Sequence, residues 1–377
     1  MSTAATARSR FTAEEVRASA SPDPAFQAAL DRLDTPDPKR NMVEVLLKEK
    51  ASLAAEFPAM RAALARTRPR GVSETEHFLP LSTGFTSRVI IVSRKTVDAD
   101  AAKAPVVVLL HGGGFVMGFP EFDLELARIA TMATGAVFVL PTYRLTPDHL
   151  FPSSINDTWA VVQLVAKELS ASPESRSKLL PPNADAAAGF IIGGTSAGAN
   201  MASVIAHLAH DAKLQPPLTG QFFTCGSFML PRSYAPIPSR YADAWLSYEQ
   251  NKDDPLLPAS MVDAIMELLH MPADGSLMGS FAWPNYELGV DSEGRVGKGH
   301  VGLPPAYFQA AGMDVIRDDT LVYETVLREE SGVKTRLDLY PGFSHCAWSI
   351  LPDLEVKKKW EADSVEGLRW LLEQGSK

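Results

Sequence analysis

The stretch "GFIIGGTSAGAN", residues 189–200, decides how the chain is expected to fold. Its apolar start is typical of a buried strand, and residues 197–214 are typical of a helix. Between them, Gly194, Ser196 and Gly198 have the G-x-S-x-G spacing of a sharp strand-to-helix turn that holds a serine in strained geometry above the sheet. Side chains two positions either side of the serine would collide there, and glycine removes the collision. The helix also directs its first N–H groups toward any oxyanion formed beside the serine.

Strands and helices alternate on both sides of this turn. The segments "ETEHFLPL" and "TSRVIIVS" have the period of two expected of a hairpin, and "APVVVLL" is the first fully buried strand. Further strands are predicted at "GAVFVLP", "LTGQFFTCG", "PAYFQAAG" and "TRLDLYPG", with helices at about 121–134, 153–170, 197–213, 318–331 and 356–373. This order predicts an α/β fold with a mostly parallel central sheet and helices on both faces.

Two stretches depart from the alternation. Residues 1–70 have helical spacing and no convincing strand, and residues 228–302 are rich in Pro, Tyr, Trp and Met. We expect them to form a helical cap over the strand ends, where open α/β sheets bind their ligands. The sheet is then built from a first part, residues 71–227, and a second part, residues 303–377.

The composition argues against several kinds of partner. The chain of 377 residues carries 36 basic and 45 acidic residues, a net charge of −9, so we expect no nucleic-acid partner. There is no apolar signal segment at the N-terminus and no apolar run long enough to cross a membrane, which favours a cytoplasmic protein without a membrane span. The two cysteines, Cys225 and Cys346, are too few for a disulfide framework, so we expect reduced thiols.

A serine hydroxyl is a poor nucleophile near neutral pH, so the turn requires a histidine as base and a carboxylate to orient that base. After such a turn, the acid and then the histidine are expected on loops that follow late strands. His345 directly follows the strand "TRLDLYPG" and is predicted to be the base. His270 lies in a helical stretch, and His300 precedes a strand and is predicted to be a solvated loop residue.

The same argument selects the acid. Asp314 comes just past the end of the strand "PAYFQAAG". Asp318 and Asp319 fall one turn later, at the expected start of a helix, where the helix dipole favours acids. We therefore predict a catalytic triad of Ser196, His345 and Asp314.

An oxyanion also needs N–H donors, and the strand "APVVVLL" leads directly into "HGGGF", residues 111–115. Three consecutive glycines allow bare backbone to approach a ligand, and the residue after the nucleophile supplies a further N–H. We predict an oxyanion hole formed by Gly113, Gly114 and Ala197. His111 is expected to organise the loop rather than to act as a base.

Together, the HGGG loop, the GTSAG turn and "PTYRLTPDHLFPSSINDTW", residues 141–159, resemble the motifs of hormone-sensitive-lipase-type carboxylesterases over about residues 75–375. The chain departs from the family pattern at Ala199, at "GMDVIRDD" and at Cys346, but keeps the reacting groups. The resemblance implies an α/β-hydrolase fold with a helical cap. It also implies that three residues brace the loops of the site without taking part in the chemistry: Tyr143, Arg144 and Asp157.

Two other groups of residues have simpler interpretations. His207 and His210 lie three apart on the helix after the serine, and we expect solvated positions because no third metal ligand follows with suitable spacing. Aromatic residues of the expected cap, Trp245, Trp283 and Tyr286, together with several Met residues, either line an acyl or alcohol pocket or pack a core; the sequence leaves both open.

The resemblance implies a serine esterase that cleaves short- to medium-acyl esters or a small acylated metabolite through an acyl-enzyme, with no cofactor and no metal. Relatives that resemble lactonases, amidases or plant 2-hydroxyisoflavanone dehydratases use the same machinery, so these reactions stay open. The plant gibberellin receptor resembles the family but has lost its catalytic histidine, and the presence of His345 argues against such a binding protein. A homodimer also stays open. Charges such as Asp253 and Asp254 argue against docking on a lipid surface.

Overall fold

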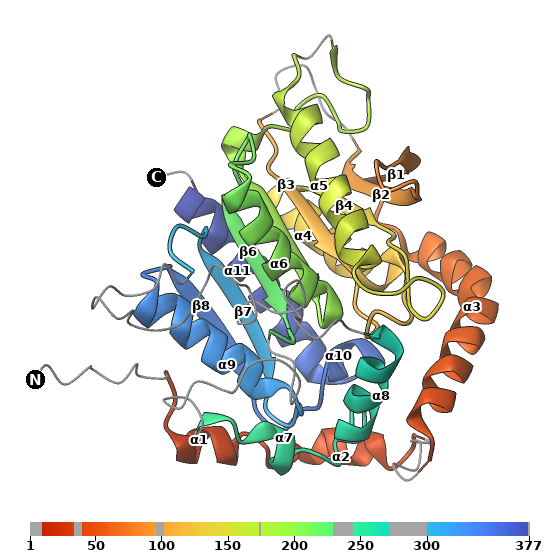
Figure 1. Ribbon diagram of the computed structural model, residues 1–377, viewed down its shortest axis with the longest axis vertical. Coiled ribbons are helices and arrows are strands. Elements are labelled where there is room, and N and C mark those ends of the chain that lie inside the picture. The colour runs from red at the N-terminus through yellow and green to blue at the C-terminus, as the bar shows by residue number, and fades with distance from the viewer. Residues whose placement is uncertain are drawn as a thin grey trace, which may run out of the picture.

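The computed structural model describes residues 10–33, 40–95, 102–172, 175–228, 244–270 and 300–375. They contain an eight-stranded sheet in the order β1-β2-β4-β3-β5-β6-β7-β8 (Figure 1). The strands are β1 (Val72–Pro80), β2 (Thr86–Arg94), β3 (Val106–Leu110), β4 (Val137–Pro141), β5 (Phe190–Thr195), β6 (Gly220–Thr224), β7 (Ala306–Ala311) and β8 (Thr335–Tyr340). The pairs β1–β2 and β2–β4 are antiparallel and all others are parallel, which confirms the predicted mostly parallel sheet.

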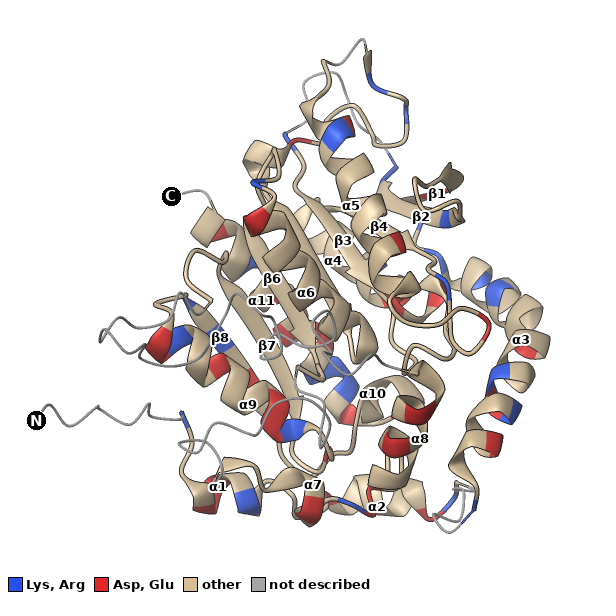
Figure 2. Ribbon diagram, viewed as in Figure 1, with Lys and Arg blue, Asp and Glu red and all other residues tan. Residues whose placement is uncertain are grey.

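Helices cover the sheet on both faces, as the alternation predicted. One face packs against α5 (Ser153–Ser170), α6 (Ala197–Asp211) and α9 (Arg317–Thr325), and the other against α4 (Leu124–Thr134) and α11 (Glu355–Gly375). Because successive side chains of a strand point to opposite faces, Val106 and Val108 of β3 join the first core and Val107 joins the second. This is why the central strands are apolar at nearly every position and carry no charged residue (Figure 2).

The remaining helices gather at one end of the sheet, with α3 along its side (Figure 1). They are α1 (Ala13–Ala18), α2 (Pro24–Leu30), α3 (Met42–Thr67), α7 (Ser247–Gln250), α8 (Ala259–Leu269) and α10 (Ala347–Ile350). Asn41 begins α3 because its side chain accepts hydrogen bonds from the N–H groups of Val43 and Glu44. The apolar faces of α3 and α8 pack together and reach Val116 and Ile316, which belong to the loops after β3 and β7.

None of the helices that the structure describes combines the length and apolar character needed to cross a membrane.

Candidate active site

The turn between β5 and α6 has the strained geometry predicted from its glycines. Ser196 has φ 55° and ψ −117°, values that few residues other than glycine adopt. A Cβ atom at Gly194 would lie 2.3 Å from the carbonyl carbon of Gly198, and one at Gly198 would lie 2.0 Å from the carbonyl oxygen of Leu110. Both approaches are shorter than any real contact. Only glycine fits these two positions, and the turn holds the half-buried Ser196 at the carboxyl end of the sheet.

The fold brings the three residues predicted as a triad into one chain of hydrogen bonds. The Nε2 atom of His345 lies 2.9 Å from the Oγ atom of Ser196, and its Nδ1 atom lies 2.6 Å from Oδ2 of Asp314. His345 comes from the loop after β8 and Asp314 from the loop after β7. Parallel strands place their carboxyl ends at the same edge of a sheet, so these loops meet beside the turn after β5.

Charge and burial have opposite effects on the pKa of the His345 imidazole. Burial lowers the pKa of His345, but the charge of the Asp314 carboxylate and its hydrogen bond outweigh burial and raise the pKa to about 9. The Asp314 carboxylate is itself almost completely buried, with 1% of the residue exposed. The pair therefore favours the imidazolium form that would arise when the histidine accepts a proton.

A second carboxyl group lies behind this pair, contrary to the expectation of a surface charge. Asp254 is buried, and its Oδ1 atom accepts hydrogen bonds of 2.8 Å from the N–H groups of both Leu256 and Leu257. Burial raises the pKa of Asp254 to about 7, and the charge of Asp314 adds to the shift. The "DPLL" sequence, residues 254–257, is typical of a turn closed by an aspartate side chain, and it is the signal by which the residue could have been found.

The predicted oxyanion donors lie around the same space as the serine. Gly113 and Gly114 have φ of 114° and 61°, and a Cβ at Gly113 would lie 2.1 Å from the carbonyl oxygen of Met117. Ala197 is the first residue of α6, where helix N–H groups have no partner within the helix. All three line one cavity with Ser196 and His345. The arrangement suits an anionic oxygen next to the serine.

His111 holds the glycine loop in place. Its buried ring donates from Nδ1 to the carbonyl oxygen of Gly112 at 2.7 Å and stacks on Tyr143 with ring centroids 4.2 Å apart. The Tyr143 hydroxyl donates to the His111 carbonyl oxygen at 2.8 Å. Burial lowers the pKa of His111 to about 4, so the ring is neutral and serves as a hydrogen-bond donor in the loop.

Arg144 and Asp157 form a two-pronged ion pair beside this loop. The Nε and Nη2 atoms of Arg144 each lie 2.8 Å from one oxygen of Asp157, which is fully buried. Thr83 donates to the same carboxylate at 2.6 Å. The pair ties the segment after β4 to α5 and to the turn between β1 and β2, and it does not contact the serine cavity.

The cavity in front of Ser196 has a volume of about 530 Å³. The residues that line it are mostly apolar and come from the glycine loop, from α3 and α8, and from the loops after β7 and β8; they include Leu46, Met60, Met261, Ile265, Ile316 and Ile350. Two methionines of the 228–302 stretch, Met261 and Met266, are thus pocket residues. Trp245 instead donates to Asp319 at 3.2 Å and is absent from the lining, while Trp283 and Tyr286 lie outside the described residues.

Two expectations about histidines are wrong. His207 and His300 are not solvated: both are 0% exposed, and their ring nitrogens lie 2.8 Å apart. His207 lies on the buried side of α6, and His300, in the loop before β7, covers its ring. His210, three residues later, is exposed as expected.

Asp318 and Asp319 lie at the start of a helix, as expected, but they also have hydrogen-bond partners that the sequence did not indicate. Both lie in the first turn of α9, as predicted. However, Asp318 forms a fully buried ion pair with Arg317 at 2.7 Å and accepts hydrogen bonds from the N–H groups of Leu246 and Ser247. The two N–H donors lie 72 and 71 positions away in the chain, so the helix pattern alone does not reveal them.

Comparisons with known proteins agree with this architecture. A family model described as alpha/beta hydrolase fold matches residues 107–349. An AB hydrolase superfamily protein of Schizosaccharomyces pombe is 30% identical over 307 residues, 81% of this chain and 81% of that protein. The carboxylesterase NlhH of Mycobacterium tuberculosis is 30% identical over 250 residues, 64% of this chain and 66% of that protein. The crystal structure of vibralactone cyclase is similar with a TM-score of 0.79 at 25% identity, over 96% of this chain and 97% of that one. The chain therefore belongs to the α/β-hydrolase fold family, as its resemblance to hormone-sensitive-lipase-type carboxylesterases predicted.

Proposed function

We propose that the protein is a serine esterase in which Ser196, His345 and Asp314 form the catalytic triad and Gly113, Gly114 and Ala197 form the oxyanion hole. The observation that carries the proposal is the continuous hydrogen-bond chain from Asp314 through His345 to Ser196, opening into a cavity lined by the glycine loop. Similarity to a carboxylesterase at 30% identity supports the choice of esters as substrates.

In this mechanism, the Oγ atom of Ser196 attacks the ester carbonyl carbon while Nε2 of His345 takes the hydroxyl proton. The oxyanion accepts hydrogen bonds from the backbone, and the intermediate collapses as His345 gives the proton to the departing alcohol. Water then attacks the acyl-enzyme, with His345 again as base, and releases the acid and the free serine. Asp314 holds the imidazole in the tautomer that presents Nε2 to the serine. No cofactor enters these steps.

We propose substrates with short or medium acyl groups, or a small acylated metabolite. A cavity of about 530 Å³ with a mostly apolar lining is of ordinary size for a small-molecule site and accommodates acyl chains below about ten carbons. Helices α3 and α8 form one wall of the cavity, which supports a cap built from residues 1–70 and 228–302. A cytoplasmic location and a homodimer stay predictions, for fractionation and sedimentation measurements to decide.

A second candidate is formation or opening of a lactone by the same acyl-enzyme. The likeness to vibralactone cyclase favours it, because an acyl group on the serine can be transferred to a hydroxyl of the substrate itself as well as to water. Amide hydrolysis depends more strongly than ester hydrolysis on proton donation to the leaving group. It is the third reaction compared in the test.

The test combines a substrate panel with labelling. Rates on matched ester, lactone and anilide substrates are compared, and the protein is treated with a serine-reactive phosphonate and digested for mass spectrometry. We expect ester hydrolysis to be fastest and the phosphonate to be bound to Ser196. Labelling at another residue would overturn the nucleophile assignment, and a faster reaction on lactones would replace the substrate class while keeping the triad.

A further inference from the structure

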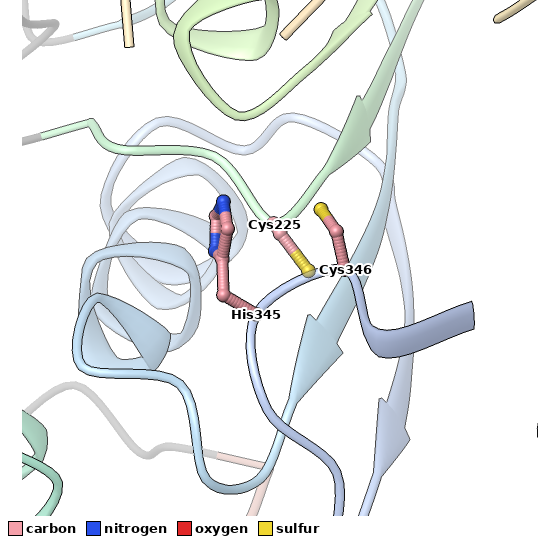
Figure 3. Close-up of side chains that lie close together, drawn as sticks. All are labelled: Cys225, His345 and Cys346. Atoms are coloured by element: carbon pink, nitrogen blue, oxygen red, sulfur yellow. The ribbon is translucent and has the colours of Figure 1, made fainter. Parts of the chain in front are cut away.

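Both cysteines of the chain lie next to the imidazole of the proposed triad. Cys225 follows β6 directly, and Cys346 follows His345 in the chain. Both are buried and neither is in a disulfide. Figure 3 shows the two side chains next to each other, with the ring of His345 beside Cys225. The ends of two strands, β6 and β8, therefore bring two thiols and an imidazole together, although Cys225 is far from the other two in sequence.

The spacing of these groups is close to that of a metal centre. The two sulfur atoms and a ring nitrogen of His345 all lie within 4.8 Å of one another. In a tetrahedral zinc site, with Zn–S of about 2.3 Å and Zn–N of about 2.0 Å, neighbouring ligand atoms are about 3.5–3.8 Å apart. Metal binding therefore requires the three ligand atoms to move closer together. Two thiolates and one imidazole are the donor set that Zn²⁺, Cd²⁺ and Co²⁺ accept, with a fourth position left for water.

The surroundings of the two cysteines and His345 favour a cation, and the cavity gives it access. The carboxylate of Asp314 lies 2.6 Å from Nδ1 of His345, so a negative group adjoins the cluster. Cys346 and His345 also line the cavity that contains Ser196. A small cation can reach the cluster from the substrate side.

We propose that Cys225, Cys346 and His345 form a binding site for a thiophilic divalent cation, and that its occupation switches the esterase off. Two thiol protons leave to solvent as two metal–sulfur bonds form. The ring nitrogen of His345 that binds the metal must be unprotonated, so the second proton of the imidazolium also leaves to solvent, and this nitrogen exchanges its hydrogen bond to Ser196 or to Asp314 for a metal–nitrogen bond. The imidazole cannot hold the metal and serve the triad at the same time, so inhibition is complete at full occupancy and reversed by a chelator. The inhibition rests on the proposed function, whereas the binding does not.

Binding is tested first with Co²⁺ alone, on chelator-treated protein under a non-thiol reductant. We expect one Co²⁺ per chain, with the visible bands of a tetrahedral site and the ultraviolet band of thiolate-to-metal charge transfer. In Cys225→Ser, the charge-transfer band should lose the intensity that one thiolate contributes. The affinity for Co²⁺ should fall at least about 100-fold, because even the loss of a residue that only hydrogen-bonds to a metal ligand lowers metal affinity about 10–100-fold. If Cys225→Ser does not fold, Cys346→Ser gives the same comparison. A spectrum without a thiolate band, or one equal in the variant, would overturn the site.

Inhibition is then measured with Zn²⁺ on ester hydrolysis. Cys225 does not line the cavity, so Cys225→Ser should keep the hydrolytic activity but require at least about 100-fold more Zn²⁺ for half-inhibition. His210→Gln is the matched control, because His210 and Asp211, 3.3 Å apart at the surface, offer an unrelated place for zinc. Its inhibition curve should equal that of the native protein. Equal inhibition of the native protein and Cys225→Ser would refute the switch. Co²⁺ binding by a protein without esterase activity would leave the site standing and overturn only the proposed function.

Discussion

His345 Nε2 lies 2.9 Å from Ser196 Oγ, although 149 positions separate the two residues in the chain. The contact exists because the turn after β5 and the loop after β8 both lie at the carboxyl edge of the same parallel sheet. Residues between them supply the third member: Asp314, in the loop after β7, accepts the hydrogen bond of the opposite ring nitrogen at 2.6 Å. The relationship makes the serine, rather than another hydroxyl, the group to test first.

Ser196→Ala should reduce the turnover of a good ester by at least about four orders of magnitude, because the loss of a triad nucleophile typically costs this much or more. The small side chain leaves no cavity, and the oxyanion donors stay in place. We therefore expect an unchanged unfolding temperature and retained substrate binding, measured calorimetrically. A variant that keeps more than about a hundredth of the native rate would exclude Ser196 as the nucleophile.

Asp314→Asn and Asp318→Asn should have opposite signatures. The first should lower kcat by about 10⁴-fold with little change in stability, since it removes the group that orients His345. The second leaves Arg317 as an unpaired charge that is 0% exposed, and should lower the free energy of unfolding by about 3–5 kcal/mol while folded molecules stay active. Kinetics and denaturant unfolding of both variants decide between them. A larger loss of kcat at Asp318 would reverse the assignment of the acid.

The pH dependence of kcat/KM follows from the raised pKa of His345. Catalysis needs the neutral imidazole, so activity is lost as pH falls through the folded pKa, and half-maximal kcat/KM is expected near pH 9. Burial lowers this pKa and Asp314 raises it, so Asp314→Asn should move the residual profile to lower pH. Asp254→Asn, which removes a weaker contribution, should move it less. A native profile already flat at neutral pH would contradict the prediction.

Deletion of residues 1–40 should impair the site before it disrupts the sheet. The Gly342 N–H donates to the carbonyl oxygen of Ser19 at 2.7 Å, and Phe26 packs against Phe343, so α1 and α2 support the loop that leads to His345. We expect lower activity and weaker hydrogen-exchange protection in that loop, with unchanged strand content by circular dichroism. Phe26→Ala, a milder change at a fully buried position, should produce a smaller loss of activity. Unchanged kinetics in the truncated protein would show that the segment does not support the site.

The acyl-length profile tests the size of the cavity. Rates on p-nitrophenyl esters from acetate to palmitate should peak below about ten carbons, as the family resemblance implies, and a cavity of about 530 Å³ is of ordinary size for a small-molecule site. No jump in rate is expected when an emulsified triglyceride passes its solubility limit, because the net charge of −9 opposes docking on an anionic interface. Interfacial activation, or a maximum at palmitate, would refute the proposed substrate class.

Most of the fold and of the candidate site could be predicted from local sequence patterns. Each strand and helix has a pattern that depends on near neighbours, and Gly194 and Gly113 are required by contacts with residues close in the chain, Gly198 and Met117. Gly198 is required by the distant carbonyl oxygen of Leu110, and the sequence indicated it only through the motif spacing. The order of elements then placed Asp314 and His345 at strand ends. The chain alone was therefore sufficient for the sheet, for the helices on its two faces, and for the three residues that the fold brings together.

Contacts between distant segments were decided only by the tertiary structure. The sequence shows His207 and His300, Asp254, and the two cysteines as separate residues, and its patterns indicated solvated histidines and a surface aspartate. In the fold, His300 covers His207, Asp254 lies buried behind Asp314, and Cys225 meets Cys346 beside His345. Periodicity reports which face of an element is apolar, but not which polar groups the neighbouring elements bring to it. Their pairing depends on packing across the whole sheet, because a buried polar or charged group is tolerated only where another segment supplies its partner.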